Sequence, residues 1–338
     1  MKSCNGVFIS TGTCHKDLPR HGVAGLFFAL VFLMAGCSSI QPSVAPASQS
    51  LRLQVPFVEQ EVAYCGPAAL SSALQFYGRD ASLESLVKQV YLPGREGSLT
   101  LEMTAASRRN ALLPYPVGAS LDSLLQELDA GHPVLVLQNL GFNWWPQWHY
   151  ALLVGYEQNG EKLLLHSGEI AYYEISAGTF MRTWARSEHW GLVLTPVDQI
   201  PATAEAVKYL KTLEQMRETR SLAPPQLLSA LTQAAAHWPR SSSAQLALAN
   251  HLLATGQHAA ASNHFLKGIE LRPDNALAWN NLAYSLKAQG CEATARVAID
   301  EAVKLAPNDA RIKASGEDIG AAGNNRSADC PTLPYAGL

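Results

Sequence analysis

Residues 64–70, YCGPAAL, place a cysteine directly before an apolar helical pattern. Pro67 suits the first turn of a helix, where the missing proline N–H has no carbonyl to bond. An apolar stripe at helical spacing follows, at Leu70, Ala73, Leu74 and Tyr77. A thiol at a helix N-terminus faces unpaired N–H groups and the positive end of the helix dipole, which lower its pKa and favour the reactive thiolate. Cys65 is therefore a candidate nucleophile, and the alternative is an inert, buried cysteine.

Helical and strand-like patterns follow one another from residue 51 to about residue 196. Helical periodicity is found at 67–77, 83–91, 99–110 and 121–130. Strand-like runs are found at 133–139, 150–157, 162–166 and 191–195. Asn159-Gly160 stands between two of these runs and is a strong signal for a two-residue hairpin turn. Helices followed by strands predict an α+β domain over residues 51–197.

The C-terminal half has a different pattern, with no strand-like run and a period of 34 residues. Prolines and glycines recur at this spacing, at Pro239, Pro273 and Pro307 and at Gly256 and Gly290. The spacing resembles that of tetratricopeptide repeats, which are helix-turn-helix units of this length. The resemblance implies an all-α domain over residues 198–320, with clear repeats at 242–275 and 276–309 and a degenerate helical pair before them. Residues 321–338 are expected to form a loose tail.

The N-terminus, residues 1–36, has the pattern of an export signal. Basic residues precede an apolar run over residues 23–35. Ala-Gly directly before Cys37 resembles the lipobox of bacterial lipoproteins, which implies that Cys37 is lipidated and that Ser38 directs the protein to the outer membrane. The alternative is an uncleaved anchor helix, but about thirteen apolar residues are short for spanning a bilayer. Residues 37–50 are rich in Ser, Pro and Ala and carry no charge, which predicts a flexible tether.

Three cysteines remain once the export signal is removed and Cys37 is lipidated: Cys65, Cys291 and Cys330. An exported compartment permits disulfides. Cys291 and Cys330 lie in the same half of the chain, so a bond between them is the pairing that the sequence offers. Cys65 is then the odd thiol, and an unpaired cysteine in an exported protein suggests a reactive role.

A thiolate nucleophile needs a base, and His149 is the histidine best placed to be one. It begins the strand-like run 149–156, and a histidine at the mouth of a strand can project toward a helix N-terminus. A cysteine followed by a distant strand histidine is the order found in papain-like enzymes. A lone strand histidine is usually structural, so the hypothesis depends on its joint occurrence with Cys65.

Three motifs together resemble those of bacteriocin-processing peptidases, the cysteine peptidases that remove double-glycine leaders. The motifs are Gln60, residues 65–68 (CGPA) and residues 148–156 (WHYALLVGY). The resemblance covers about residues 51–196 and implies a papain-like fold. It also implies that Cys65 attacks a peptide carbonyl, that His149 acts as general base and then as acid, and that the Gln60 side chain donates an N–H to the oxyanion.

The third catalytic position departs from that family, which usually has Asp or Asn on the strand after the histidine. Here the strand reads LLLHSG at residues 163–168. A two-residue Asn-Gly turn makes Leu153 face His166, which places His149 and His166 on one face of the sheet. This register predicts His166 as the group that orients His149, whereas a bulge would select Ser167. The alternative is that His166 is an ordinary strand residue.

The remaining sequence features limit the kinds of ligand that the protein is expected to bind. Trp145 and Trp148 crowd the approach to His149 and are candidates for the walls of a substrate cleft; the alternative is packing in a core or lid. The formal net charge of −3 gives no electrostatic footprint for nucleic acid. The sequence has no Gly-rich phosphate loop and no cluster with zinc-ligand spacing, so we expect neither a cofactor nor a metal.

The sequence therefore predicts a lipid-anchored cysteine peptidase of the cell envelope, facing the periplasm. Its substrates would be peptides or proteins, and its repeats would bind a protein partner through a concave surface. Two alternatives stay open. One is an adaptor in which a catalytically weak or dead peptidase domain accompanies working repeats, and the other is a cell-wall endopeptidase of papain-like fold.

Overall fold

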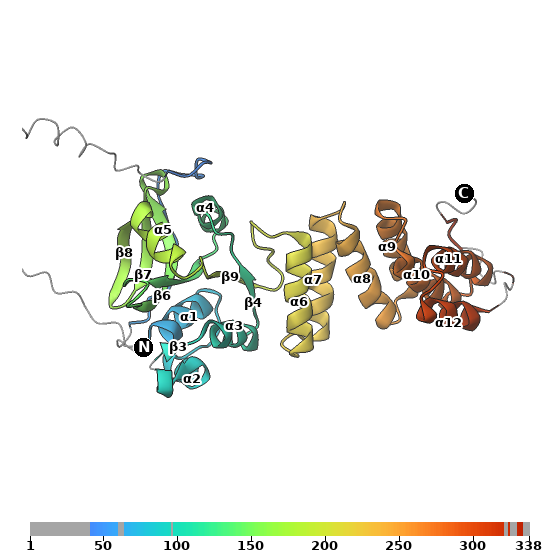
Figure 1. The fold of residues 1–338 in the computed structure, drawn as a ribbon, viewed down its shortest axis with the longest axis horizontal. Coiled ribbons are helices and arrows are strands. Elements are labelled where there is room, and N and C mark those ends of the chain that lie inside the picture. Colours follow the sequence, from blue (N-terminus) through green and yellow to red (C-terminus); the bar gives the residue numbers. More distant parts are fainter. Residues whose placement is uncertain (1–40, 60–63, 96, 321–323, 325–329, 334–338) are drawn as a thin grey trace, which may run out of the picture. The chain divides into compact units, whose positions relative to one another are not determined.

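The computed structural model describes residues 41–59, 64–95, 97–320, 324 and 330–333 (Figure 1). Contacts divide the chain into two compact units. The first unit comprises residues up to 110 together with 116–194, and the second comprises 111–115 together with 195–338. Among the described residues, the first unit holds most of the strands and the second is almost entirely helical.

The described residues form a seven-stranded sheet in the order β4-β9-β5-β6-β7-β8, with β1 pairing with β6 beyond the end of β5. The strand pairs β9–β5, β5–β6, β6–β7 and β7–β8 are antiparallel. The strands are β1 (Leu51–Arg52), β4 (Leu112–Pro116), β5 (Val134–Asn139), β6 (Trp148–Glu157), β7 (Lys162–Ser167), β8 (Ile170–Ser176) and β9 (Gly191–Pro196). A separate two-stranded ribbon joins β2 (Tyr91–Leu92) to β3 (Gly97–Ser98).

Among its described residues the first unit has five α-helices (Figure 1). They are α1 (Cys65–Phe76), α2 (Leu83–Val90), α3 (Thr100–Arg109), α4 (Leu121–Asp129) and α5 (Ala177–Ala185). Of these, α1, α4 and α5 pack on this sheet, and α2 and α3 pack on α1. Helix α1 contacts β5, β6 and β7, whereas α5 contacts β5, β7 and β8. Leu70 and Leu74 of α1 are fully buried, as the apolar stripe predicted. The α+β class is therefore confirmed, with α1 as the central helix.

The second unit consists of paired helices. They are α6 (Ala206–Glu218), α7 (Pro224–His237), α8 (Ser242–Ala254), α9 (His258–Leu271), α10 (Ala276–Ala288), α11 (Glu292–Leu305) and α12 (Ala310–Ile319). The periodic glycines Gly256 and Gly290 end α8 and α10 with φ values of 76° and 78°. In both turns the next N–H returns to a carbonyl of the last helical turn, at 2.8 Å from Gln257 to Leu252 and at 3.0 Å from Cys291 to Leu286. Glycine is favoured there because a left-handed backbone costs it nothing.

A disulfide joins Cys291 to Cys330, with the two Cα atoms 5.5 Å apart. The sequence left this pairing open, and the structure contains it. Cys291 is the residue directly before α11, so the bond fastens the described end of the tail to the turn between α10 and α11. Cys65 forms no disulfide.

The described part of the predicted tether is held against the first unit rather than loose. The N–H of Ser43 donates to a carboxylate oxygen of Asp122 in α4 at 2.8 Å, and the N–H of Ala47 donates to Asp129 at 2.9 Å. Tyr156 of β6 donates its hydroxyl to the same Asp129 carboxylate at 2.5 Å. Residues 43–48 of the predicted tether thus contact α4, whose two carboxylates accept the N–H groups of Ser43 and Ala47.

Candidate active site

Cys65 is the first residue of α1, and its side chain is 8% exposed. The first turn of the helix is tightly packed. A Cβ on Gly66 would lie 2.9 Å from the Ser98 hydroxyl oxygen of β3 and 3.1 Å from the Met103 sulfur of α3. A glycine beside the cysteine therefore allows β3 and α3 to pack closely against the first turn of α1. The thiol stands at the positive end of the α1 dipole, the environment that stabilises a thiolate.

His149 is the second residue of β6 and is 6% exposed. Its Nε2 lies 2.8 Å from the hydroxyl oxygen of Ser167, the last residue of β7. A neutral imidazole has one N–H donor and one acceptor nitrogen. With the proton on Nε2, His149 donates to Ser167 and Nδ1 is the basic nitrogen. Ser167 thus occupies the place from which a third catalytic residue orients a histidine.

The register of β6 and β7 explains why Ser167, and not His166, lies beside His149. The two strands pair as predicted from the turn up to Gly155 and Leu164. A bulge at Val154 then shifts the register, so that Leu152 rather than Leu153 faces His166. Because side chains alternate between faces, one extra residue moves His166 to the opposite face from His149. The prediction that His166 orients His149 is therefore wrong.

Both ring nitrogens of His166 contact backbone groups. Its Nε2 lies 3.0 Å from the carbonyl oxygen of Val55, and Nδ1 lies 3.3 Å from the backbone nitrogen of Tyr172 in β8. The neutral tautomer satisfies both contacts, with Nε2–H donating to Val55 and Nδ1 accepting from Tyr172. Burial lowers the pKa of His166, which favours this neutral form.

The N-terminus of α1 and the His149 end of β6 meet around Ser98. Tyr150, the residue after His149, donates its hydroxyl to the Ser98 carbonyl at 3.4 Å, and Ser98 lies against Gly66. Burial, and then the nearby Cys65 thiolate, raise the pKa of Tyr150. Helix α1 also packs on β6 (Figure 1). The fold thus carries the cysteine and the histidine to the same end of the sheet although 84 positions separate them.

Comparisons with known families assign both units. Residues 52–189 match the Peptidase C39 like family. Residues 249–290 match the model of a TPR repeat. These matches confirm the two resemblances that the sequence suggested. The chain therefore has a C39-like domain built on an antiparallel sheet, followed by a helical region with tetratricopeptide repeats.

Two solved structures are similar to the C39-like domain. One is a double glycine motif protease from an AMS/PCAT transporter in complex with the leader peptide; it is 21% identical, covers 45% of this chain and 99% of its own, and has a TM-score of 0.34. The other, from Bacillus anthracis and assigned as a C39-like peptidase, is 16% identical, covers 44% of this chain and 98% of its own, and has a TM-score of 0.36. No curated protein sequence matches the chain.

The tryptophans expected at the cleft lie on a projecting hairpin of the C39-like domain. Trp145 is 54% exposed and its neighbour Trp144 is 79% exposed, whereas Trp148, the first residue of β6, is partly buried. The ring of Trp144 stacks on Phe142 with the two planes 6° apart. The hairpin tip is ordered by Asn139, whose side-chain oxygen accepts from the N–H groups of Gly141 and Gln147. Trp144 and Trp145 are therefore not core residues.

Two predicted residues, Gln60 and Cys37, lie outside the described residues, so their roles stay predictions. Within residues that are described, no group of three or more His, Cys, Asp and Glu side chains is arranged to hold a metal ion. None of the described helices combines the length and the apolar character needed to cross a bilayer. Tyr172 was missed from the sequence, because nothing in the run IAYYEIS distinguishes it from its neighbour Tyr173.

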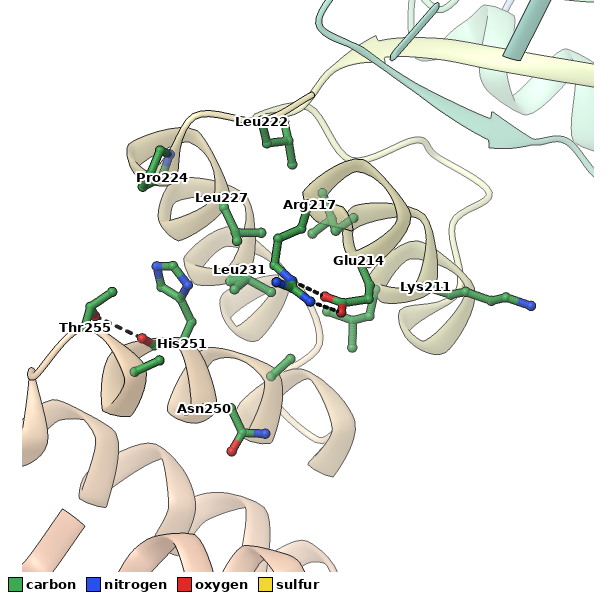
Figure 2. Close-up of a pocket in the computed structure, with 14 residues that line it drawn as sticks. Lys211, Glu214, Arg217, Leu222, Pro224, Leu227, Leu231, Asn250, His251 and Thr255 are labelled. Carbon is green, nitrogen blue, oxygen red and sulfur yellow. Dashed lines mark hydrogen bonds and ion pairs between the residues drawn. The ribbon is translucent and has the colours of Figure 1, made fainter. Parts of the chain in front are cut away.

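A cavity of about 730 Å³ lies in the second unit, between α6, α7 and α8 (Figure 2). Leucines of α6 and α7 line it, and Asn250 and His251 of α8 face them. Arg217 and Glu214 of α6 form an ion pair at the cavity, with a second hydrogen bond of 2.7 Å, and Lys211 points away from it (Figure 2). The cavity has the size and the apolar lining of a ligand or peptide pocket.

Proposed function

We propose that the C39-like domain is a cysteine peptidase in which Cys65 is the nucleophile and His149 the general base. The carrying observation is the pair formed by His149 and Ser167 at the end of the sheet where α1 presents its thiol. Acyl transfer from a peptide requires an activated nucleophile and an oriented base. Cys65 would be the nucleophile, and His149, held by Ser167, would be the base.

The proposed reaction conserves protons at each step. Nδ1 of His149 takes the thiol proton, and the Cys65 thiolate attacks the substrate carbonyl to form a C–S bond. The negative charge moves to the carbonyl oxygen, where the resemblance assigns Gln60 and the Cys65 N–H as donors. When the C–N bond breaks, His149 returns its proton to the leaving amine. His149 then takes a proton from water, whose oxygen bonds to the thioester carbon; the C–S bond breaks, the acid product leaves, and His149 returns the proton to the Cys65 sulfur.

Ser167 supports this chemistry less strongly than a carboxylate would. Its hydroxyl oxygen accepts the Nε2–H of His149, which fixes the ring and the tautomer. A neutral hydroxyl stabilises the imidazolium less than a carboxylate does, because it carries no net charge. We therefore expect slow turnover rather than a different reaction.

We further propose that the protein works in the cell envelope, lipid-anchored through Cys37 at the outer membrane and facing the periplasm. The supporting observation is the disulfide between Cys291 and Cys330, since structural disulfides persist in exported proteins. Replacing Cys37 with Ala should release the processed protein from membranes and remove labelling by a fatty-acid probe. Retention of Cys37→Ala protein in washed membranes would contradict the anchor.

The repeats are proposed to bind a protein, either the substrate or a partner that delivers it. The cavity between α6, α7 and α8 offers apolar side chains with an amide and an imidazole beside them. Such a lining suits a peptide segment that carries apolar side chains on a polar backbone.

The function is tested by comparing envelope protein N-termini from cells with wild-type protein, Cys65→Ala and His149→Ala. We expect at least one new N-terminus that depends on both residues, with a loss of at least about 10²-fold in its rate of formation in vitro. The Tyr209→Phe variant in the second unit is a control for expression. Identical N-termini in all four strains would contradict proteolysis, and digestion of purified peptidoglycan would instead favour a cell-wall endopeptidase.

A further inference from the structure

A short segment, residues 53–58, connects β1 to the chain that leads into Cys65. We call this segment the strap. Its first residue is fixed to the sheet, because the N–H of Leu53 donates to the Val154 carbonyl at 2.9 Å. Its last residue is fixed to α1, because the N–H of Val58 donates to the Ser72 hydroxyl at 3.2 Å. The strap therefore spans from the bulge in β6 to the helix that carries the nucleophile.

Two side chains from β7 and β8 hold the middle of the strap. His166 donates from Nε2 to the Val55 carbonyl at 3.0 Å, and the Tyr172 hydroxyl donates to the Leu53 carbonyl at 3.1 Å. The rings reinforce these bonds, since His166 packs edge-on against Phe57 of the strap and against Tyr172. The Leu53 carbonyl also accepts the N–H of Val55 at 2.9 Å, within the strap itself, so the side-chain bonds are what tie these carbonyls to β7 and β8.

The two side chains depend on each other through an unusual backbone conformation. Tyr172 has a φ of 53°, a left-handed value that a bulky residue rarely adopts. It lies in a second irregularity of the sheet, where the register between β7 and β8 shifts after Leu165. In this conformation its N–H points at Nδ1 of His166, at 3.3 Å. Strain of this kind persists only where the surroundings hold it, and it gathers at functional sites.

We propose that His166 and Tyr172 are positioning residues of the C39-like domain. They clamp the strap to β7 and β8, and the strap is in turn bonded through Val58 to α1, the helix that carries Cys65. The proposal rests on the proposed peptidase function. Neither residue touches the reacting atoms in this scheme, and their action is to hold the strap in place beside α1.

The clamp requires a neutral His166. Protonation would place an N–H on Nδ1 against the N–H of Tyr172, so one of the two bonds would be lost. The charged groups beside the clamp are Arg52, whose guanidinium lies 4.7 Å from the Tyr172 ring centre, and Glu157, which pairs with Arg52 at 3.2 Å. His149, in β6, points to the opposite face of the sheet, where it is bonded to Ser167. The charge of Arg52 is paired with that of Glu157, and burial lowers the pKa of His166, which favours a neutral imidazole.

The test compares the full-length wild-type chain with His166→Gln, His166→Leu and Tyr172→Phe. Gln keeps a donor for the Val55 carbonyl and cannot be protonated, whereas Leu removes both contacts. Tyr172→Phe removes only the bond to Leu53 and serves if the Leu variant fails to fold. Tyr156→Phe is the matched control, because it removes a buried tyrosine hydroxyl from the same sheet at the end far from Cys65.

Two readouts separate the clamp from the nucleophile. One is the affinity of a peptide aldehyde, which forms a hemithioacetal with Cys65: the sulfur bonds to the carbonyl carbon, the C=O π bond breaks, and the thiol proton passes to the oxygen on the now tetrahedral carbon. The other is the rate of alkylation by iodoacetamide, which needs the thiolate alone. We expect His166→Leu and Tyr172→Phe to lose at least about tenfold in aldehyde affinity and in kcat, with alkylation within twofold of wild type. Tyr156→Phe should change neither.

The dependence of aldehyde affinity on pH is a further readout, and it would not change if His166 had a purely structural role. Wild-type aldehyde affinity should fall as the pH drops through the lowered pKa of His166, and His166→Gln should lack that step. Equal aldehyde affinities and equal acid limbs in wild type and variants, with a reactive Cys65, would overturn the clamp. A wild-type Cys65 that alkylates like a free thiol and binds no aldehyde would instead overturn the peptidase function, and the clamp with it.

Discussion

The Nε2 atom of His149 lies 2.8 Å from the hydroxyl oxygen of Ser167, and a single bulged residue in β6 brings them to one face of the sheet. Without Val154 as an extra residue, the strand pairing would have put His166 in that place. The bulge is supported by the strap, since the N–H of Leu53 donates to the Val154 carbonyl at 2.9 Å. The geometry of the candidate site is therefore set by a backbone irregularity as much as by side-chain choice.

Ser167 is predicted to limit the turnover rate without changing the type of reaction. Replacing it with Ala should lower kcat by about tenfold or more, because His149 loses the partner that orients its ring. Replacing Ser167 with Asp should keep kcat at the wild-type value or raise it, because a carboxylate stabilises the imidazolium. Steady-state kinetics on a substrate found from the envelope comparison measure both. A Ser167→Ala variant as active as wild type would contradict the orienting role.

Gly155, next to the bulge, is predicted to be sensitive to any side chain. A Cβ there would lie 2.2 Å from the Leu51 carbonyl oxygen of β1, a backbone atom that cannot move alone. We expect Gly155→Ala to lower the free energy of unfolding by at least about 1–3 kcal/mol and to reduce activity further by displacing β1 and the strap. Urea unfolding measures the first effect. Gly94→Ala is the control, since a Cβ on Gly94 has no atom within 4 Å, and equal stability of the two variants would refute the prediction.

The hairpin between β6 and β7 shows how far the sequence alone could predict the site. The Asn-Gly turn forms as expected, with φ of 54° at Asn159 and 87° at Gly160. It fixes the register through Gly155 and Leu164, as the turn geometry requires. The bulge at Val154 could not be predicted, because it depends on the approach of β1 from a distant part of the chain. A local pattern therefore located the turn and the strands, and a tertiary contact selected Ser167.

Other elements also fall into two groups: those that a local sequence pattern predicts, and those that it does not. The buried stripe of α1 and the periodic glycines of α8 and α10 are local signals, and both were predicted. Strand β8 was missed because most of its side chains are exposed and show no alternation between buried and exposed positions. The contact of residues 43–48 with α4 was missed because that segment carries no charge of its own and its partners, Asp122 and Asp129, lie about 80 positions away.

The disulfide is predicted to stabilise the end of the repeat region. It closes a loop with a sequence separation of 39, so its loss should cost about 2–4 kcal/mol. Reduction should lower the Tm of the wild-type helical unfolding transition. A Cys291→Ser, Cys330→Ser double variant should have the lower Tm already and should not respond to the reductant. An unchanged wild-type Tm under reducing conditions would contradict this stabilisation.

The contact of residues 43 and 44 with α4 is predicted to be acid-labile. Hydrogen bonds from Ser43 and Val44 lower the pKa of Asp122, so these bonds stabilise the contact above the ordinary Asp pKa and are lost as the pH falls through the lowered value. Amide exchange protection at Ser43 should therefore drop below about pH 4. The Ser85 amide, which bonds the uncharged Ser82 hydroxyl, is the control. Parallel behaviour of the two amides would contradict the linkage to Asp122.

The pairing of Cys65 with His149 is tested most directly by the pH dependence of Cys65 alkylation. Iodoacetamide labelling of wild-type protein should have its midpoint below about pH 7, because the α1 dipole and the imidazolium stabilise the thiolate. The same measurement on His149→Ala should shift the midpoint upward by at least about one pH unit. A midpoint near pH 8.5 in both proteins, the value of a free thiol, would contradict a catalytic cysteine at this site.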